Sequence, residues 1–383
     1  MVTAIVTILI FLVLISLHEF GHFAAAKASG VGVLEFSIGM GPKIIQKVRK
    51  GTVYSLRALP IGGYCRLEGE DVDSDSESAF GNQKLWKRFV VIAAGAVLNI
   101  LLGFVIFVII VGMQKNIYTT SIQSVDERAY IAQAGLTEND KIIGINGHKV
   151  GFYNDISYYL GDVSKDTEIT VDIKRDGKKK SFTFLPSEEK QTVVYDENGA
   201  SITTSINGIE KQSYITFTDE QKEMYADYIG KEQSSQRYIL GFTPKIESVS
   251  VTNIFPEAYH CTCFVVKLVY GAIADLFKGE TGIEEFSGPV GVAAAVDTAV
   301  HTKQYTMENI LNLVAMLTIN LGLFNLLPIP ALDGGRLFFL LIELIFRKPV
   351  PPDKEGLVHT IGMLLLLVFA AVVLYNDIMK MFF

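Results

Sequence analysis

The sequence His18-Glu19-Phe20-Gly21-His22 lies inside an apolar run that extends from Val2 to Ala26. On a helix, two imidazoles four positions apart lie on one face about one turn apart, where they can bind a single metal ion. Glu19 stands beside them and can take a proton from a metal-bound water. Polar groups are costly inside a membrane-length segment, so this pattern predicts a hydrolytic zinc site rather than histidines merely satisfied by their neighbours.

The composition fits several membrane spans together with a polar domain. Hydrophobic residues make up 49% of the 383 residues, a share compatible with spanning helices. The net charge of -7 argues against a nucleic-acid partner. Only three cysteines occur, so we expect no disulfide framework, and we interpret Cys261 and Cys263 beside His260 as a chance cluster.

The first apolar run is predicted to be a spanning helix that stays in the protein. It has no Lys or Arg before it and no small-residue cleavage site after it, which is unlike a removable signal peptide. A helix from Thr3 to His18 rises about 22 Å, so the histidines should lie toward the far side of a core about 30 Å thick. The basic segment from Lys27 to Arg88 predicts that this side is the cytoplasm and that the N-terminus is outside.

Two features of the basic segment have alternative interpretations. The stretch from Gly51 to Glu68 predicts a hairpin in which 52–57 is followed by 59–67, and Gly62 and Gly63 permit a close backbone approach. This hairpin is either an edge strand offered to an extended peptide or an ordinary turn. The acidic run from Glu68 to Glu77 is most simply a solvated loop.

The second span, Phe89 to Gly112, should lead to a domain outside the membrane. Asn99 is its one strongly polar residue and is predicted to face other helices. Alternating strand patterns, with a turn at Asp176-Gly177, predict a mostly β domain from 114 to about 256. Residues 134–150 resemble the signature of PDZ domains over about 121–186, with Asn139 where glycine is usual, and about 187–244 is interpreted as an insertion.

The last third of the chain is predicted to return to the membrane. The stretch from Phe255 to Phe277 carries charged residues, so we expect a helix lying at the interface, followed by a turn at Ser287-Gly-Pro-Val-Gly. The third span, Asn309 to Leu327, ends at a proline-rich break that leads to Asp333. If the β domain is outside, this span runs inward like the first one.

Asp333 is therefore predicted to meet His18 and His22 at the same membrane depth. Two imidazoles and one carboxylate form a three-ligand catalytic zinc set with a position left for water. The alternative is that Asp333 is only a helix N-cap before Gly334. On the third span, Asn320 and Asn325 can donate hydrogen bonds to a substrate carbonyl or can hold helices together.

Leu357 to Leu374 is predicted to be a fourth span that returns the C-terminus outside. The expected fold is thus a multi-pass α-helical membrane protein with about four spans and a mostly β domain that contains a PDZ module. Its parts are a membrane region at 1–113, the external domain at 114–256, and an interfacial helix with the last two spans at 257–383.

The sequence resembles the bacterial site-two proteases, a family of intramembrane zinc metalloproteases. The resemblance covers nearly the whole chain, and its motifs occur in the order of that family. They are His18-Glu-Phe-Gly-His22, Gly62-Gly-Tyr, Asn82-Gln-Lys-Leu-Trp-Lys-Arg88, the PDZ signature, Ser287-Gly-Pro-Val-Gly, and Asn325-Leu-Leu-Pro-Ile-Pro-Ala-Leu-Asp-Gly-Gly335. One recognisable PDZ signature, where two can occur, and the insertion from Ser187 are departures that affect gating and substrate choice.

The resemblance implies a role for each matching position. His18, His22 and Asp333 are implied to bind Zn²⁺, with Glu19 as general base. Asn320 and Asn325 match positions that hold substrate, and the hairpin around Gly62 and Gly63 matches the strand that pairs with it.

The resemblance also implies a substrate and a location. The substrate is a single-pass membrane protein in the lipid bilayer, such as an anti-sigma factor already trimmed by another protease, or a signal-peptide remnant. The location is the bacterial cell membrane, with both termini and the PDZ domain outside and the active site near the cytoplasmic side. The PDZ domain is implied to filter substrates by size or to dock them.

Two other classes of protein use similar residues. A metal transporter also places His and Asp inside the membrane, but transporters commonly show repeated halves, and we find none in this sequence. A silent scaffold that presents a PDZ domain has no need of Glu19 beside all three ligands. Turnover of a substrate distinguishes the protease from both.

Overall fold

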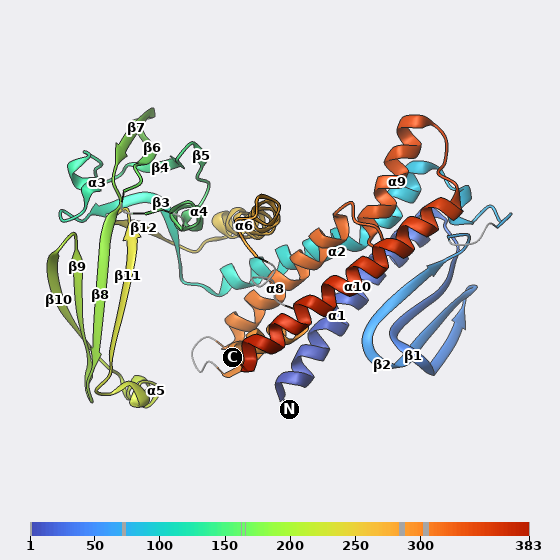
Figure 1. Ribbon diagram of the computed structural model, residues 1–383, viewed down its shortest axis with the longest axis horizontal. Helices are drawn as coiled ribbons and strands as arrows, with labels where there is room; N and C mark the ends of the chain where they lie inside the picture. The colour runs from blue at the N-terminus through green and yellow to red at the C-terminus, as the bar shows by residue number, and fades with distance from the viewer. Residues whose placement is uncertain are drawn as a thin grey trace. The chain divides into compact units, whose positions relative to one another are not determined.

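A computed structural model describes residues 2–70, 74–161, 163–164, 166–282, 288–301 and 306–382. The chain forms two compact units (Figure 1). The first consists of Met1–Ile110 together with Cys261–Phe383, and the second of Val111–His260. The first unit holds the predicted metal site, and the second is mostly β structure.

The first unit is built from long apolar helices. They are α1 (Val2–Ser29), α2 (Leu85–Met113), α8 (Thr306–Leu326), α9 (Asp333–Phe346) and α10 (Pro352–Phe382), with the shorter α7 (Pro289–His301) and the 3-10 helix η1 (Phe80–Asn82). Helix α6 (Val251–Lys278) begins in the second unit and ends in the first. Large apolar side chains such as Leu9, Leu101 and Leu365 are more than half exposed, as lipid-facing side chains are.

Five helices of the described residues are long and apolar enough to cross a membrane, namely α1, α2, α6, α8 and α10. Four of them contain the predicted spans, except that α8 ends at Leu326, one residue before the predicted end of the third span. The fifth, α6, was predicted to lie at the interface, and its length and composition also permit a crossing. Of the predicted turn before α7, Ser287 lies outside the described residues, and the helix itself begins at Pro289.

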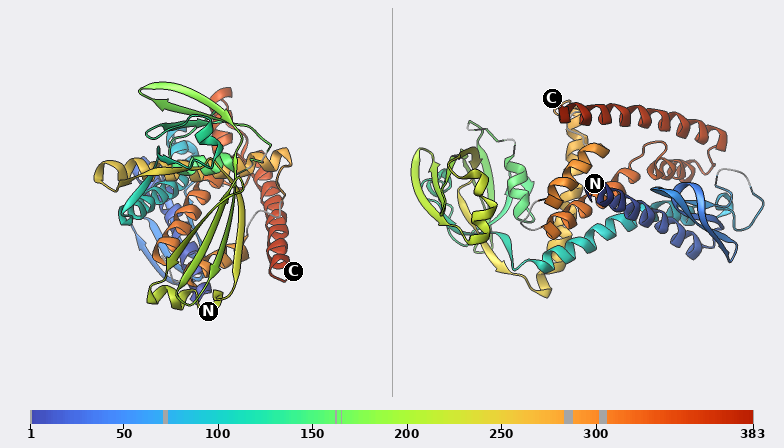
Figure 2. Two further views of the ribbon diagram at one scale, coloured as in Figure 1. Left: turned by 90° about the vertical axis from the view of Figure 1, so that its left-hand side faces the viewer. Right: turned by 90° about the horizontal axis from the view of Figure 1, so that it is seen from below.

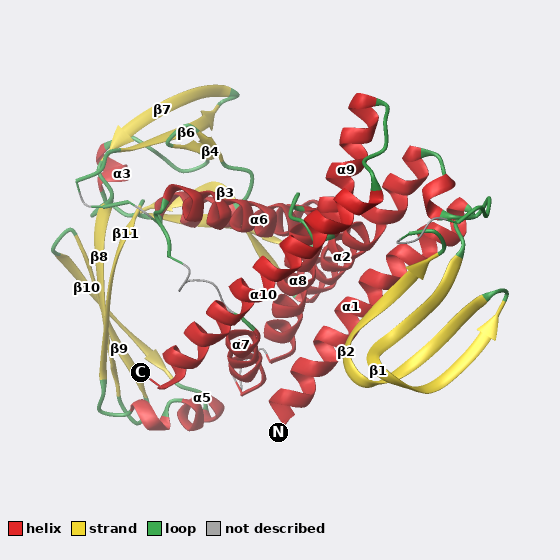
Figure 3. Cartoon of the chain, turned by 45° about the vertical axis from the view of Figure 1, so that its right-hand side comes forward, coloured by secondary structure: helices red, strands yellow, loops and turns green. Residues whose placement is uncertain are grey.

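A strongly bent sheet follows α1 and consists of β1 (Val33–Arg49) and β2 (Thr52–Leu67), shown beside α1 in Figure 3. Its register places the segments 63–67, 33–38, 52–57 and 43–49 side by side. The predicted pairing of 52–57 with 59–67 is wrong, because both flank 33–38. Buried residues alternate along that segment at Val33, Glu35 and Ser37, which makes it a central strand.

The acidic run after β2 is only partly a solvated loop. Glu68 accepts a hydrogen bond from Ser78 Oγ at 2.6 Å, and Glu70 pairs with Arg336 of α9. Residues 71–73 of this run lie outside the described residues. The prediction of a wholly solvated loop is therefore wrong for Glu68 and Glu70, because each carboxylate has a partner within the fold.

The second unit contains a six-stranded sheet. Its strands are β3 (Asn116–Val125), β4 (Lys141–Ile145), β5 (His148–Lys149), β6 (Ile169–Arg175), β7 (Lys178–Phe184) and β12 (Phe242–Ser248), with helices α3 (Tyr130–Gln133) and α4 (Tyr153–Leu160). The predicted turn at Asp176-Gly177 joins β6 to β7, with φ of 51° and 76°. Asn139 has φ 67°, the left-handed geometry that its residue type tolerates.

A second, four-stranded sheet occupies the predicted insertion (Figure 2). It consists of β8 (Ser187–Tyr195), β9 (Gly199–Ile206), β10 (Ile209–Thr216) and β11 (Glu232–Ile239), with α5 (Asp219–Met224) and the 3-10 helix η2 (Ala226–Tyr228) before β11. The strand order is β10-β9-β8-β11. The sheet ends at Ile239 rather than near 244, because β12 begins at Phe242 and pairs with β3.

Candidate metal centre

Three side chains predicted from the sequence converge in the first unit. His18 and His22 lie one turn apart on α1, and Asp333 is the first residue of α9. Asp333 Oδ2 lies 3.1 Å from His18 Nε2 and 3.2 Å from His22 Nε2. The two Nε2 atoms are 3.2 Å apart. The N-cap residue of α9 is Leu332, and Asp333 is the first residue inside the helix, so the prediction that Asp333 is the N-cap is wrong.

The spacing of these donor atoms fits a zinc ion. Zinc is held by imidazole nitrogen and carboxylate oxygen at about 2.0 to 2.2 Å with tetrahedral geometry, which separates any two ligand atoms by about 3.3 Å. All three measured separations are close to this value. Among the described residues, this is the group of His, Cys, Asp and Glu side chains that can hold a metal.

The other ring nitrogens of the histidines are held by α2. His22 Nδ1 lies 2.9 Å from the carbonyl oxygen of Val91, to which it donates. The amide of Asn99 lies 3.3 Å from His18 Nδ1. When Nε2 binds a metal, Nδ1 carries the proton. The amide of Asn99 is then oriented with Oδ1 toward the Nδ1 proton of His18. Oδ1 of Asn99 has no other hydrogen-bond partner among the described residues. The prediction that Asn99 faces other helices is confirmed.

Gly95 lets α2 reach the histidines. A Cβ atom built on Gly95 meets His22 Nε2 at a distance that no real contact shows, and lies 2.9 Å from His18 Cε1. Gly21 of α1 lies against Gly95, because a Cβ atom built on Gly21 lies 2.8 Å from Gly95 Cα. The backbones of α1 and α2 therefore touch. Sequence reasoning missed Gly95, although the run of small residues at 93–96 was a signal of close helix packing.

We expect Gly95→Ala to reduce zinc binding and proteolysis strongly, because the added methyl occupies the place of both imidazoles. Gly112→Ala on the same helix is the matched control, since a Cβ there has nothing within 4 Å among the described atoms. Zinc content of the two purified variants, measured by mass spectrometry of the metal, checks the prediction. Equal zinc in both variants contradicts it.

Glu19 lies beside the edge of the bent sheet. A Cβ on Gly63 lies 3.6 Å from Glu19 Cγ and 2.8 Å from the carbonyl oxygen of Ser37. A side chain at position 63 therefore interferes with the sheet and approaches Glu19. Gly62, with φ 78°, adopts a left-handed conformation that favours glycine. The two glycines thus bring the strand 63–67 close to the carboxylate.

The two predicted asparagines of α8 differ in their contacts. Asn325 Nδ2 donates to the carbonyl oxygen of Leu321 at 3.0 Å, within its own helix. Asn320 Oδ1 is buried and has no hydrogen-bond partner among the described residues. Buried polar atoms are seldom unpaired, so Asn320 is the better of the two candidates for a contact with substrate.

Helix α9, which begins at Asp333, makes two ion pairs with other segments. Arg88 of α2 lies 2.9 Å from Glu343, and Arg336 pairs with Glu70. Leu337 and Leu340 pack into an apolar core with Val91 of α2 and Ala26 of α1. Position and orientation of Asp333 therefore depend on contacts from several distant segments.

A buried charge network holds the sheet beside Glu19. Glu35, only 5% exposed, accepts from Ser55 Oγ at 2.7 Å and Arg57 Nη2 at 3.0 Å, and Lys43 Nζ lies 3.4 Å away. Burial alone raises the pKa of Glu35, but these hydrogen bonds, together with one from Tyr64, lower it from 4.5 to about 2.

We expect the sheet to lose stability as the pH falls from about 4.5 toward 2. The pKa of Glu35 is lower in the folded protein than in the unfolded chain, so its charged carboxylate stabilises the fold at pH values above about 4.5. This stabilisation is lost as the pH falls toward the folded pKa of about 2. Hydrogen-exchange protection factors of 33–57 in micelles, corrected for the intrinsic rate, measure the effect. Glu35→Gln should lower protection at pH 7 and flatten this acid dependence, and an unchanged acid profile in the variant contradicts the prediction.

Comparisons with known proteins identify the family of this chain. The profile of peptidase family M50 matches residues 6–369. A protein of Clostridium acetobutylicum named "Putative zinc metalloprotease" is 31% identical over 98% of this chain and 96% of its own length. Proteins of the same printed name from Fusobacterium nucleatum and Staphylococcus aureus strain COL are 30% and 27% identical, with at least 99% of both chains covered.

A multi-pass membrane protein with two histidines and one carboxylate around a zinc-sized space belongs to the membrane-embedded metalloproteases. The chain belongs to peptidase family M50, the site-two proteases, and it is a zinc metalloprotease. The resemblance stated from its motifs is confirmed.

Proposed function

We propose that this protein cleaves a transmembrane segment of single-pass membrane proteins, with zinc bound by His18, His22 and Asp333. The observation that carries the proposal is the convergence of three donor atoms within 3.2 Å of one another, with Glu19 adjacent to His18. The site lies on helices that are apolar enough to cross a membrane, so its substrate is expected in the same layer.

The site residues have different roles in the proposed reaction. Zinc, when bound, acts as a Lewis acid that polarises the peptide carbonyl and acidifies water. The carboxylate of Glu19 accepts a proton from the attacking water and delivers it to the leaving amine. Val91 and Asn99 orient the two imidazoles through their Nδ1 atoms, which keeps Nε2 directed at the metal.

The strand 63–67 offers a way to hold the substrate. Within the described residues it pairs with 33–38 on one side, and its other edge has no strand partner. A peptide in a helix has its amide groups hydrogen bonded internally, so it must unwind before it is cut. An unwound peptide can add to this edge as a strand, next to Glu19. Asn320 of α8, whose buried Oδ1 has no hydrogen-bond partner among the described residues, is proposed as a further contact with substrate.

The connectivity supports an external β domain and an interfacial α6. Helix α1 carries His18 and His22 in its second half, and α8 ends shortly before Asp333, so we infer that both cross in the same direction and that α2 crosses back. The chain between α2 and α8 then makes no net crossing. If α6 crossed the membrane, α7 would have to bring the chain back. Helix α7 has 13 residues and rises about 20 Å, which is too short for a core about 30 Å thick. The basic segment after α1 places the site near the cytoplasmic side.

The external unit is proposed to dock substrates through a PDZ-like groove. A groove of about 750 Å³ lies between α4 and the segment that joins β11 to β12, with Ile156, Leu160 and Leu240 in its lining. Strand β12 pairs with β3 and, in the described part of the chain, with no other strand. An extended peptide end, such as one left by a previous protease, can add to β12 there.

Cleavage by the purified protein in lipid vesicles tests the proposed function. The probe is a fluorescent single-pass reporter, offered either with a folded external domain or with that domain removed. We expect a cut inside the apolar segment that is faster for the trimmed reporter, is lost after chelation and returns with zinc. Cuts confined to residues outside the apolar segment contradict intramembrane cleavage.

A further inference from the structure

Helix α10 contacts the loop that carries Asp333 through a hydrogen bond to the main chain. The backbone N–H of Ala331 donates to His359 Nδ1 at 2.8 Å. Because Nδ1 accepts, the ring proton is on Nε2, which lies 3.8 Å from Glu355 Oε1. The imidazole also packs on Phe339 of α9, with ring centroids 5.7 Å apart. His359 therefore joins α10, the loop and α9.

The loop needs such support because its conformation is unfavourable. Ala331 has φ 76°, in the left-handed region that residues other than glycine enter only at an energetic cost. Such a conformation persists only where its surroundings hold it. The hydrogen bond from its own N–H to His359 is one such contact, and Asp333 follows only two residues later.

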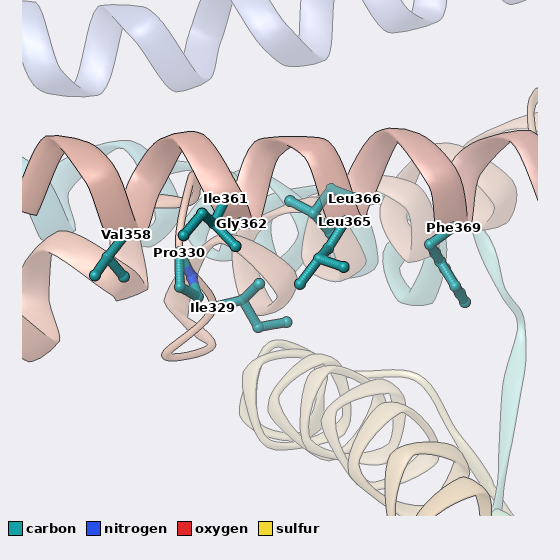
Figure 4. A pocket seen from close by; sticks show the side chains of 8 residues that line it. All are labelled: Ile329, Pro330, Val358, Ile361, Gly362, Leu365, Leu366 and Phe369. Carbon is teal, nitrogen blue, oxygen red and sulfur yellow. The ribbon is translucent and has the colours of Figure 1, made fainter.

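A second contact brings α10 against the same loop. A Cβ atom on Gly362 lies 2.7 Å from the carbonyl oxygen of Pro330 and closer still to its side chain, so only glycine allows this approach. Figure 4 shows Pro330 and Ile329 facing α10 along an apolar cavity of about 390 Å³. A cavity of about 350 Å³, lined by His359, Arg336 and Asp333 itself, lies along the same loop. The loop is therefore not packed tightly on every side. Its conformation depends correspondingly more on the two contacts with α10, the hydrogen bond to His359 and the close approach at Gly362.

We propose that His359 is a positioning residue that fixes the main chain at Ala331 and thereby places Asp333 as the third zinc ligand. It contacts neither the reacting atoms nor the metal and acts through the loop. This inference rests on the proposed role of Asp333 as a ligand. Residues that orient metal ligands change metal affinity when they are replaced, typically by about 10- to 100-fold.

The test compares two replacements of similar size. His359→Asn retains an acceptor for the Ala331 N–H, whereas His359→Leu has none. Zinc affinity of the purified full-length protein is measured by competition with a chromophoric chelator, alongside melting of the zinc-free protein to verify folding. We expect zinc binding about tenfold weaker in His359→Leu and close to wild type in His359→Asn. Leu364→Ala, at an exposed position of α10, is the control.

A third variant tests the link through the backbone. Ala331→Gly removes the steric cost of the left-handed conformation, so in the His359→Leu background it should recover part of the lost zinc affinity. Equal affinities of the Asn and Leu variants, or no recovery by Ala331→Gly, overturn the inference. Asp333→Ala distinguishes failure of the proposed ligand set from failure of the proposed role of His359. If it binds zinc like the wild type, the proposed ligand set fails. If it loses zinc while His359→Leu does not, only the role of His359 fails.

Discussion

Replacement of Glu19 by Gln is expected to lower cleavage of a single-pass reporter by roughly 10³-fold while the protein keeps its zinc. The amide is nearly isosteric with the carboxylate, so packing beside Gly63 is retained. It cannot accept the proton of the attacking water, and loss of general acid and base catalysis costs about 10² to 10⁴ in rate. Single-turnover cleavage in vesicles, with zinc content measured on the same sample, checks both parts of the prediction.

A matched substitution controls for the loss of one charge. Glu223→Gln makes the same chemical change at an exposed position of α5, in the other unit. It should leave both rate and zinc content unchanged. A Glu19→Gln variant that retains cleavage with zinc bound shows that another group is the base, and one that loses its zinc shows that Glu19 belongs to the metal site.

Asp333→Ala is expected to remove zinc and proteolysis together, because two imidazoles alone leave an incomplete ligand set for a catalytic zinc site. Asp333→Ser is the informative companion. Serine is a favourable residue at the start of a helix, so it preserves any contribution that Asp333 makes to α9 but is a poor zinc ligand. We expect the Ser variant to lose zinc as the Ala variant does. Retained zinc in the Ser variant contradicts the ligand role.

The metal site was predictable because its signal is local in sequence. The spacing of His18 and His22 fixes their relation on a helix, and the expected direction of the spans predicted that Asp333 would lie near them, as it does. The contacts that hold these ligands were not predictable in detail. Gly95 and His359 contact segments far away in the sequence, and a glycine or a single histidine carries no pattern that identifies its distant partner.

The sheets were predicted less well than the helices. Local turn signals identified the β6–β7 hairpin at Asp176-Gly177. The bent sheet was mispaired because the central segment 33–38 contacts two other segments, and pairing between distant segments leaves no local signature. In the second unit, 57 residues separate β7 from β12, which returns to the six-stranded sheet by pairing with β3. The insertion therefore ends a few residues earlier than predicted.

The edge of 63–67 that has no strand partner among the described residues has a consequence for inhibitor design. An edge strand recognises a partner through main-chain amide and carbonyl groups, which are the same in every peptide sequence. If substrates add to this edge as proposed, we expect discrimination among them to depend on how readily a segment loses its helical structure rather than on a preferred side chain. A short β-strand mimic that carries a zinc-chelating group is therefore expected to inhibit without resembling any particular substrate, and its selectivity must come from elsewhere on the molecule.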